Sequence, residues 1–324
     1  MILIDMDPAG ADNTVKRHSA KKYPLAQFHN VEHDLLVSLD SLITKHPVGF
    51  DILNIVHEEK DLEDEAIITS LLNYLAIDYR FIIVNLPGYL DESIVKSLSQ
   101  SDFIYFVTDS NINNVTEIKE VAANVQKDLS FPEDKLSIVI HEAVFGIRTN
   151  TSARREMFGK KLCYSLPALP ATAGPQGPSA TLLVADDPEA EYSRVIRHIA
   201  RRVSNNLVGV ALGSGAAHGL AHIGVLKVLE REKIPVDIIS GSSVGALVGA
   251  FYAIGKSPEE IERIAVEVNT VPKLFRLLDI SIFPIRGLLY GKKIIKHLKK
   301  YFGDKTFDDC RIPFKVIGAD LSTR

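Results

Sequence analysis

The 324-residue sequence predicts an α/β fold with two three-layer αβα domains built on mainly parallel sheets, the second of them incomplete. Three observations predict this class. Apolar, β-branched runs alternate with helix-like stretches in the first half of the chain, a stretch rich in Pro, Gly and Ala at 166–180 interrupts the pattern, and a second alternating series begins at Leu207. Because strands that alternate with helices pair in parallel beneath helical layers, each series predicts one domain.

The first domain, residues 1–185, contains five runs that we expect to be strands. They read "MILIDMDPAG", "FDILNIV", "RFIIVNLPG", "DFIYFVTDS" and "LSIVIHE". Residues 62–75 and 114–127 carry apolar residues three and four apart, which predicts helices. A charged helix with one apolar stripe, at about 189–203, then forms the connection over residues 186–206.

The second domain, residues 207–324, begins with the strand "LVGVALG", a glycine-containing turn and the helix "LAHIGVLKVLERE". The strand "VDIISG" then leads through a second glycine turn into the helix "VGALVGAFYAIG". Helical segments follow through Phe302, and "FKVIGADL" is the last expected strand.

Composition excludes several classes of protein. With 46% hydrophobic and 24% charged residues the chain is globular, and its net charge of −4 gives no reason to expect nucleic-acid binding. The two cysteines, Cys163 and Cys310, fit neither a disulfide framework nor a metal site, which favours a reducing, cytoplasmic location. No stretch reaches the roughly 18 apolar residues that cross a bilayer, which still allows peripheral contact at the inner membrane surface.

The second glycine turn carries the Gly-x-Ser-x-Gly pattern of a nucleophile elbow. Gly241, Ser243 and Gly245 fill it between a strand and a helix, so Ser243 is the candidate nucleophile and Ser242 has a structural role. The flanking glycines permit close packing, and the helix directs its amides toward a developing oxyanion. The alternative is a tight turn in which Ser243 only caps the helix.

The first glycine turn, "GSGAAHGLAHIG" at 213–224, lies at the preceding strand-to-helix junction. Its glycines at 213, 215 and 219 do not keep the G-x-G-x-x-G register of a dinucleotide site. The next strand also ends in the serine elbow and not in an acidic residue for a ribose. Two such turns in consecutive αβ units favour an oxyanion loop beside the elbow.

From Leu207 onward the sequence resembles the N-terminal part of a patatin-like phospholipase domain, of the bacterial branch related to neuropathy target esterase. That family has a loop of the form GGGxRG followed by LAHIGVL and an elbow of the form GSSxGA. The matching stretches here are "SGAAHGLAHIGVL" and "GSSVGA". The resemblance implies a Ser-Asp dyad that deacylates lipids, lysophospholipids or other esters and needs no cofactor. It makes Ser243 the nucleophile and assigns the oxyanion to the amides of Gly213, Ser214, Gly215, Ala216 and Val244.

The loop departs from the family pattern at three positions. Ser214 and Ala216 replace glycines, and His218 stands where the family usually has an arginine. The replacement of glycine by Ala216 has little conformational cost if the φ of this residue is negative. It is unfavourable if the position needs a positive φ. His218 could still stabilise charge as a hydrogen-bond donor, whereas His222 is expected to be a packed or capping histidine.

The base implied by the family is an aspartate in an Asp-Gly-Gly or Asp-Gly-Ala turn, well over a hundred residues beyond the serine. No aspartate after Ser243 is followed by glycine. We therefore expect the base to lie outside this chain, which would stop inside its catalytic domain and be inactive as given.

The N-terminal part resembles MinD/ParA-type ATPases. "ILIDMDPAG" is similar to their "LIDxDPQ" signature and "YRFIIVNLPG" to their Walker B strand, although Asn85 stands where an aspartate is expected. Asp5 and Asp7 are the remaining acidic groups of this degenerate nucleotide site, and no Gly-Lys loop precedes them. We expect no productive ATP binding, and a rise in melting temperature with millimolar Mg-ATP would contradict this expectation.

The segment 271–302 is apolar and basic, with lysines clustered at its end. Two roles are open for it: contact with an anionic membrane surface, or a helical cover over the site.

The first functional hypothesis is a serine lipid hydrolase behind a degenerate MinD-like domain. The alternative is a nucleotide-sensing or interaction protein with an inactive patatin-like domain. An Asp-Gly-Gly/Ala turn beyond Arg324 would favour the hydrolase, and a Gly-Lys loop upstream of Met1 would favour nucleotide sensing.

Overall fold

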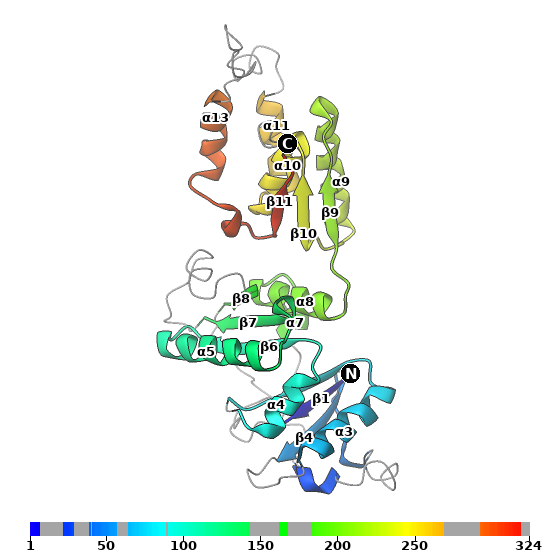
Figure 1. The fold of residues 1–324 in the computed structure, drawn as a ribbon. Coiled ribbons are helices and arrows are strands. Elements are labelled where there is room, and N and C mark those ends of the chain that lie inside the picture. The colour runs from blue at the N-terminus through cyan, green and yellow to red at the C-terminus, as the bar shows by residue number, and fades with distance from the viewer. Residues whose placement is uncertain are drawn as a thin grey trace. The chain divides into compact units, whose positions relative to one another are not determined.

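The computed structural model divides into two compact units, residues 1–148 with 158–197 and residues 149–157 with 198–324 (Figure 1). Each unit has its own sheets and its own apolar core. The structure describes residues 1–6, 22–28, 39, 41–56, 64–88, 90–142, 162–167, 183–268 and 292–318.

The first sheet of unit 1 has the strand order β2-β4-β1-β5, with β3 paired to β4. Its strands are β1 (Ile2–Asp5), β2 (Tyr23–Pro24), β3 (Thr44–Lys45), β4 (Asp51–Val56) and β5 (Ile82–Asn85). All pairs are parallel except β3 with β4. Because β1 pairs with neighbours on both sides, its apolar residues Ile2 and Ile4 are completely buried in the core beneath η1 (Leu25–Phe28) and α3 (Asp64–Asp78).

A second sheet in unit 1 has the parallel order β6-β7-β8. Its elements are β6 (Ile104–Asp109), α5 (Ile112–Asp128), η2 (Glu133–Lys135), β7 (Leu136–His141) and β8 (Leu162–Leu166). Asp91 begins α4 (Glu92–Ser99) by accepting a hydrogen bond of 2.8 Å from the Ile94 amide. The five predicted strand runs, the two predicted helices and the parallel pairing are confirmed.

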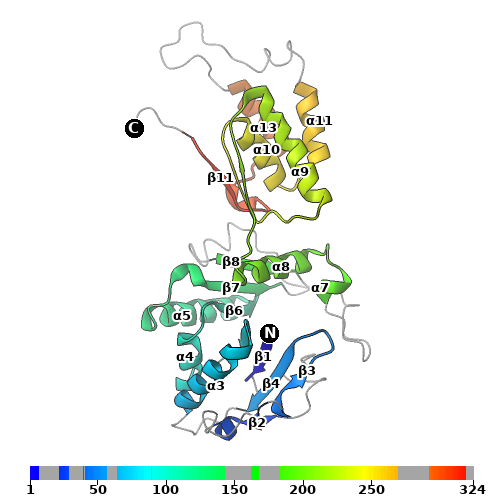
Figure 2. The ribbon, with the colours of Figure 1, turned by 90° about the vertical axis from the view of Figure 1, so that its right-hand side faces the viewer.

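Unit 2 is built on a parallel sheet of order β11-β10-β9. Its elements are β9 (Gly209–Leu212), η4 (Ala216–Leu220), α9 (Ala221–Arg231), β10 (Ile238–Gly241), α10 (Val244–Ala253), α11 (Pro258–Val268), α13 (Lys292–Phe302), η5 (Phe307–Asp309) and β11 (Phe314–Val316). The connections from β9 to β10 and from β10 to β11 both run in the same direction across the sheet. Because such crossovers are right-handed, the described helices of both connections lie on the same face of the sheet (Figure 2).

The core of unit 2 lies between that sheet and its helices. Phe251 of α10 is the aromatic residue among its buried members and stacks on Phe302 of α13, with 4.7 Å between ring centroids. Tyr301 meets the edge of the same ring at 5.5 Å and donates a hydrogen bond of 2.9 Å to Glu267. Two residues of α13 therefore hold this basic helix against the core, although no residue of the helix is buried.

A buried carboxylate joins the helix α8 (Glu191–Val203) to the sheet of unit 2. Asp237 directly precedes β10, and its side chain is only 2% exposed. It accepts hydrogen bonds from Arg201, at 2.6 Å for the shortest, from His198 Nδ1 at 2.9 Å and from the Val208 amide at 3.0 Å. Burial raises the pKa of this carboxyl, but these donors outweigh burial and lower it overall.

The other described helix of the connecting region is α7 (Leu183–Asp186), which precedes α8. None of the helices in the described ranges is long and apolar enough to cross a membrane.

Candidate functional site

The elbow forms where β10 ends at Gly241 and α10 begins at Val244. Ser243 has φ 53° and ψ −124°, a strained conformation that residues with a β-carbon rarely adopt. It is exposed, and its side chain makes no capping hydrogen bond with the helix. Ser243 therefore stands at the N-cap position of α10 without a side-chain cap, and its role as nucleophile stays a prediction.

Both elbow glycines are required by close backbone contacts. A β-carbon at Gly245 would lie 2.2 Å from the Leu212 carbonyl oxygen and 2.5 Å from that of Gly213. A β-carbon at Gly241 would lie 2.5 Å from the Ala246 α-carbon. Because all these neighbours are backbone atoms, the turn closes only with glycine at both positions.

The loop after β9 is joined directly to the elbow. The Ser242 amide donates a hydrogen bond of 3.0 Å to the Leu212 carbonyl. Gly219, in η4, lies so close to Val244 that an added β-carbon would be 3.1 Å from the valine side chain. The loop that carries Gly213, Ser214, Gly215 and Ala216 is thus held beside the serine turn, and its role as an oxyanion loop stays a prediction.

His222 makes a contact with this loop that sequence reasoning missed. Its Nε2 lies 2.9 Å from the Gly213 carbonyl oxygen. Because a carbonyl only accepts hydrogen bonds, Nε2 must carry the proton. The bond fixes the carbonyl of Gly213, and nine residues separate the partners, so no short sequence pattern marks the pair. His218, in contrast, lies exposed in η4, where its amide donates to the Gly215 carbonyl at 3.0 Å.

Ala216 occupies a left-handed backbone conformation, with φ 46°. The preceding Gly215 is extended at φ 177°, a value that any residue adopts. The position at which alanine replaces a family glycine is therefore the one that needs a positive φ, and the replacement carries a steric cost of roughly 1–2 kcal/mol.

We expect Ala216→Gly to raise the free energy of unfolding of unit 2 by about 1 kcal/mol, because relief of the positive φ outweighs the added chain entropy of glycine. Urea unfolding measures the change. The matched control is Ala217→Gly, at the next position of η4, where φ is not positive. It should lower stability by about 0.5–1 kcal/mol. Equal losses in both variants would contradict the strain at Ala216.

No base for Ser243 is found in the described parts of unit 2, where no carboxylate or imidazole forms a hydrogen bond with its hydroxyl. Asp237 lies at the amino end of β10, whereas Ser243 follows the carboxyl end of the same strand. Asp309 closes a capping box with Thr306. Asp279 and Asp320 lie outside the described residues.

The predicted nucleotide-site residues of unit 1 are partly described. Asp5 and Asn85 are paired across β1 and β5, and the Asn85 amide donates to the Asp5 carboxylate at 2.8 Å. Asp5 is 6% exposed. Asp7 lies outside the described residues. The amide thus satisfies one oxygen of the Asp5 carboxylate, and the absence of ATP binding stays a prediction.

The segment 271–302 is described only from Lys292. Its described part, α13, carries five lysines, at positions 292, 293, 296, 299 and 300. Ile295, between them, is 57% exposed.

In unit 2 a strand of the parallel sheet enters a sharp turn that carries an exposed serine, and a helix begins directly after it. Residues 210–323 match the family model described as patatin-like phospholipase. Neuropathy target esterase sws of Drosophila grimshawi is 34% identical over 146 residues, which cover 44% of this chain and 10% of that protein. A patatin-like phospholipase domain-containing protein of Caenorhabditis elegans is 35% identical over 141 residues, covering 42% and 10%.

Residues 210–323 are therefore patatin-like phospholipase sequence, homologous to neuropathy target esterase. The chain spans about a tenth of the length of these curated relatives. Among solved structures, a ParA family ATPase of Chlorobium tepidum is similar with a TM-score of 0.47 and 18% identity, over 61% of this chain and 84% of that one. The MinD cell division protein of Aquifex aeolicus is similar with a TM-score of 0.46 and 14% identity, over 64% of this chain and 85% of that one.

Proposed function

We propose that the intact protein is a serine acyl hydrolase that cleaves lipid esters at Ser243. The observation that carries the proposal is the backbone of Ser243, held at φ 53° with its side chain exposed at the start of α10. A strained residue of this kind persists only where the surrounding structure enforces it, and such residues cluster at functional sites. The family match over residues 210–323 supports a lipid or other ester as the substrate.

In the proposed reaction the Ser243 hydroxyl oxygen attacks the ester carbonyl carbon while its proton passes to a base. The base is an aspartate outside the described residues. The carbonyl oxygen becomes an oxyanion and accepts hydrogen bonds from the Val244 amide and from amides of the loop 213–216. The C–O bond of the ester then breaks, the alcohol leaves with the proton, and water hydrolyses the acyl-serine. The positive end of the α10 dipole stabilises the oxyanion in both halves.

A fluorophosphonate probe tests this assignment in the full-length protein, because the probe bonds covalently only to an activated serine. We expect labelling of Ser243, and we expect Ser243→Ala to abolish both labelling and ester hydrolysis. Ser242→Ala is the matched control, since Ser242 is half-buried and contributes its amide to the Leu212 carbonyl. Persistent labelling in Ser243→Ala, or loss of labelling only in Ser242→Ala, would overturn the assignment.

We further propose that the described face of α13 contacts an anionic membrane surface where the lipid substrate resides. Its five lysines complement acidic headgroups, and the exposed Ile295 can enter the interface. The protein should sediment with vesicles that contain phosphatidylglycerol but not with pure phosphatidylcholine, and salt should weaken the binding. Equal sedimentation with both kinds of vesicle would contradict the electrostatic contact.

A further inference from the structure

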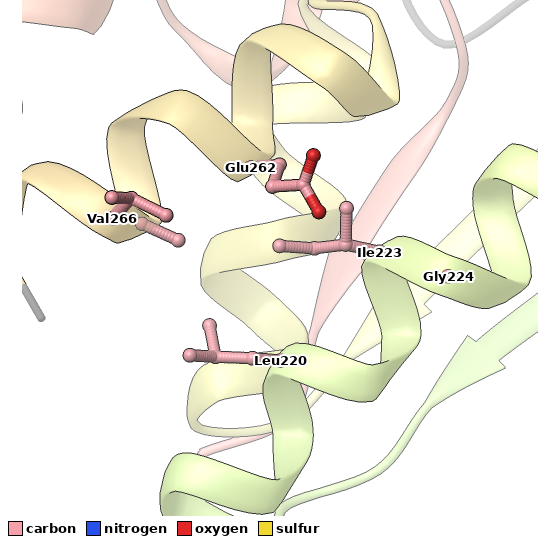
Figure 3. Close-up of a pocket in the computed structure, with 6 residues that line it drawn as sticks. Leu220, Ile223, Gly224, Glu262 and Val266 are labelled. Atoms are coloured by element: carbon pink, nitrogen blue, oxygen red, sulfur yellow. The ribbon is translucent and has the colours of Figure 1, made fainter.

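A partly open pocket of about 210 Å³ lies between α9 and α11, and its lining combines apolar side chains with the carboxylate of Glu262 (Figure 3). Six residues line it: Leu220, Ile223, Gly224, Glu262, Ala265 and Val266. The side chains of Leu220 and Val266 extend into the space between the two helices (Figure 3), and Val266 remains 62% exposed. Pockets that enclose a whole drug-sized ligand have volumes of roughly 300–1,000 Å³. This pocket is smaller, so it suits part of a ligand, such as a segment of a hydrocarbon chain.

The pocket begins where the oxyanion loop ends. Leu220 is the last residue of η4, and it directly follows Gly219, whose backbone packs against Val244 beside the nucleophile. Farther along α9, Lys227 forms an ion pair of 2.7 Å with Glu262. Seven residues of helix separate Leu220 from Lys227, which corresponds to about 10 Å. The apolar part of the groove thus runs from the loop toward a charged end.

Gly224 keeps this groove open. It lies in the interior of α9, where glycine costs roughly 0.8–1 kcal/mol relative to alanine. A β-carbon added at Gly224 would meet no atom within 4 Å, so packing does not exclude a side chain. This differs from Gly245, where backbone carbonyl oxygens at 2.2 and 2.5 Å leave no room for a β-carbon. What the missing side chain of Gly224 provides is free space in the groove.

We propose that the pocket between α9 and α11 holds the acyl chain of the ester hydrolysed at Ser243, and that Gly224 sets the space available to that chain. The inference rests on the proposed function and adds the location of the hydrocarbon. The carbonyl oxygen lies at the loop, the chain leaves past Leu220, and the apolar side chains of Ile223 and Val266 remove it from water. A polar headgroup would lose its hydration against these side chains, so it belongs outside the groove.

Binding of a fluorescent fatty acid, and its displacement by dodecanoate, tests the pocket without catalysis when measured in the full chain carrying Ser243→Ala. Gly224→Leu places a side chain in the groove and should weaken dodecanoate binding at least tenfold. Gly224→Ala should weaken it less. The matched control is Val225→Leu, which enlarges the next residue of α9 outside the pocket lining and should leave affinity unchanged. The melting temperature of Gly224→Leu should equal or exceed that of the parent, because leucine is a better helix former.

Absence of fatty-acid binding by the parent, or equal affinities in Gly224→Leu and Val225→Leu, would overturn the proposal. A second readout uses the hydrolysis of p-nitrophenyl esters by the full-length protein with Ser243 intact. Gly224→Leu should lose turnover of the dodecanoate ester at least tenfold and keep that of the acetate ester. If fatty-acid binding responds to Gly224 while the probe leaves Ser243 unlabelled, the pocket stands and the proposed hydrolase fails. If the probe labels Ser243 and fatty-acid binding does not change in the Gly224 variants, the proposed hydrolase stands and the proposed acyl pocket fails.

Discussion

Gly245→Ala is expected to lower the free energy of unfolding of unit 2 by about 3 kcal/mol and to abolish probe labelling of Ser243. The new β-carbon would lie 2.2 Å from the Leu212 carbonyl oxygen and 2.5 Å from that of Gly213. These two oxygen atoms belong to the end of β9 and the start of the loop. They cannot move without breaking the hydrogen bond that the Ser242 amide donates to the Leu212 carbonyl. Overpacking of this kind typically costs about 1–3 kcal/mol, and contact with backbone places it at the upper end.

The matched control for this variant is Gly224→Ala, the same substitution in a helix where the added carbon meets nothing within 4 Å. It should raise stability by roughly 0.8–1 kcal/mol, the propensity difference between the two residues. Urea unfolding and fluorophosphonate labelling measure both variants. If Gly245→Ala unfolds at the same urea concentration as the parent and still labels, the elbow is not held by this contact and the site geometry is wrong.

Most of the fold could be predicted from the sequence because its buried parallel strands are continuous apolar runs. β1, β4, β5, β6 and β7 each fall inside a predicted run. The same reasoning missed α4, an eight-residue helix with little length over which to show a period, although Asp91 before it is a capping signal. It also missed β8, whose sequence "LCYSL" is only five residues long, although Pro167 directly follows it as a breaker signal.

In the candidate site, too, some features were predictable from the sequence and others were not. The elbow residues are neighbours in sequence, and their spacing alone predicted a sharp turn between a strand and a helix. Contacts between distant residues left no such pattern: His222 reaches the Gly213 carbonyl, and Gly219 reaches Val244. The positive φ of Ala216 was also beyond sequence reasoning, because an alanine gives no local sign of a left-handed conformation.

Asp237 is the clearest case of a residue whose importance only the structure reveals. In the sequence it opens an apolar strand and looks like an ordinary boundary residue. In the structure its partners His198 and Arg201 come from α8, 39 and 36 residues earlier in the chain. A carboxylate that is 2% exposed is stable only with such donors, so the end of α8 and the start of β10 depend on each other.

Asp237→Asn is expected to lower the stability of unit 2 by about 3 kcal/mol at neutral pH. The amide keeps the shape but removes the charge, and its NH₂ group cannot accept from Arg201. Loss of one partner of a buried ion pair costs about 3–5 kcal/mol, and the low end applies because Arg201 and His198 are 26% and 23% exposed. The urea dependence of amide hydrogen exchange in β9 and β10 measures the loss. Asp304→Asn, at an exposed position, is the control and should change stability by less than about 0.5 kcal/mol.

The pH dependence of this loss gives a sharper test. The pKa of Asp237 is lower in the folded protein than its ordinary value of 3.8, so the folded state favours the ionised carboxylate. A depressed pKa contributes stability that is complete above the unfolded pKa, here about 4, and that is lost as the pH falls through the folded value. The stability difference between the parent and Asp237→Asn should therefore be constant from pH 7 to about pH 5 and shrink below about pH 4. A difference that grows on acidification would mean that the folded state favours the protonated carboxyl, and the ion pair with Arg201 would not be what holds α8 to the sheet.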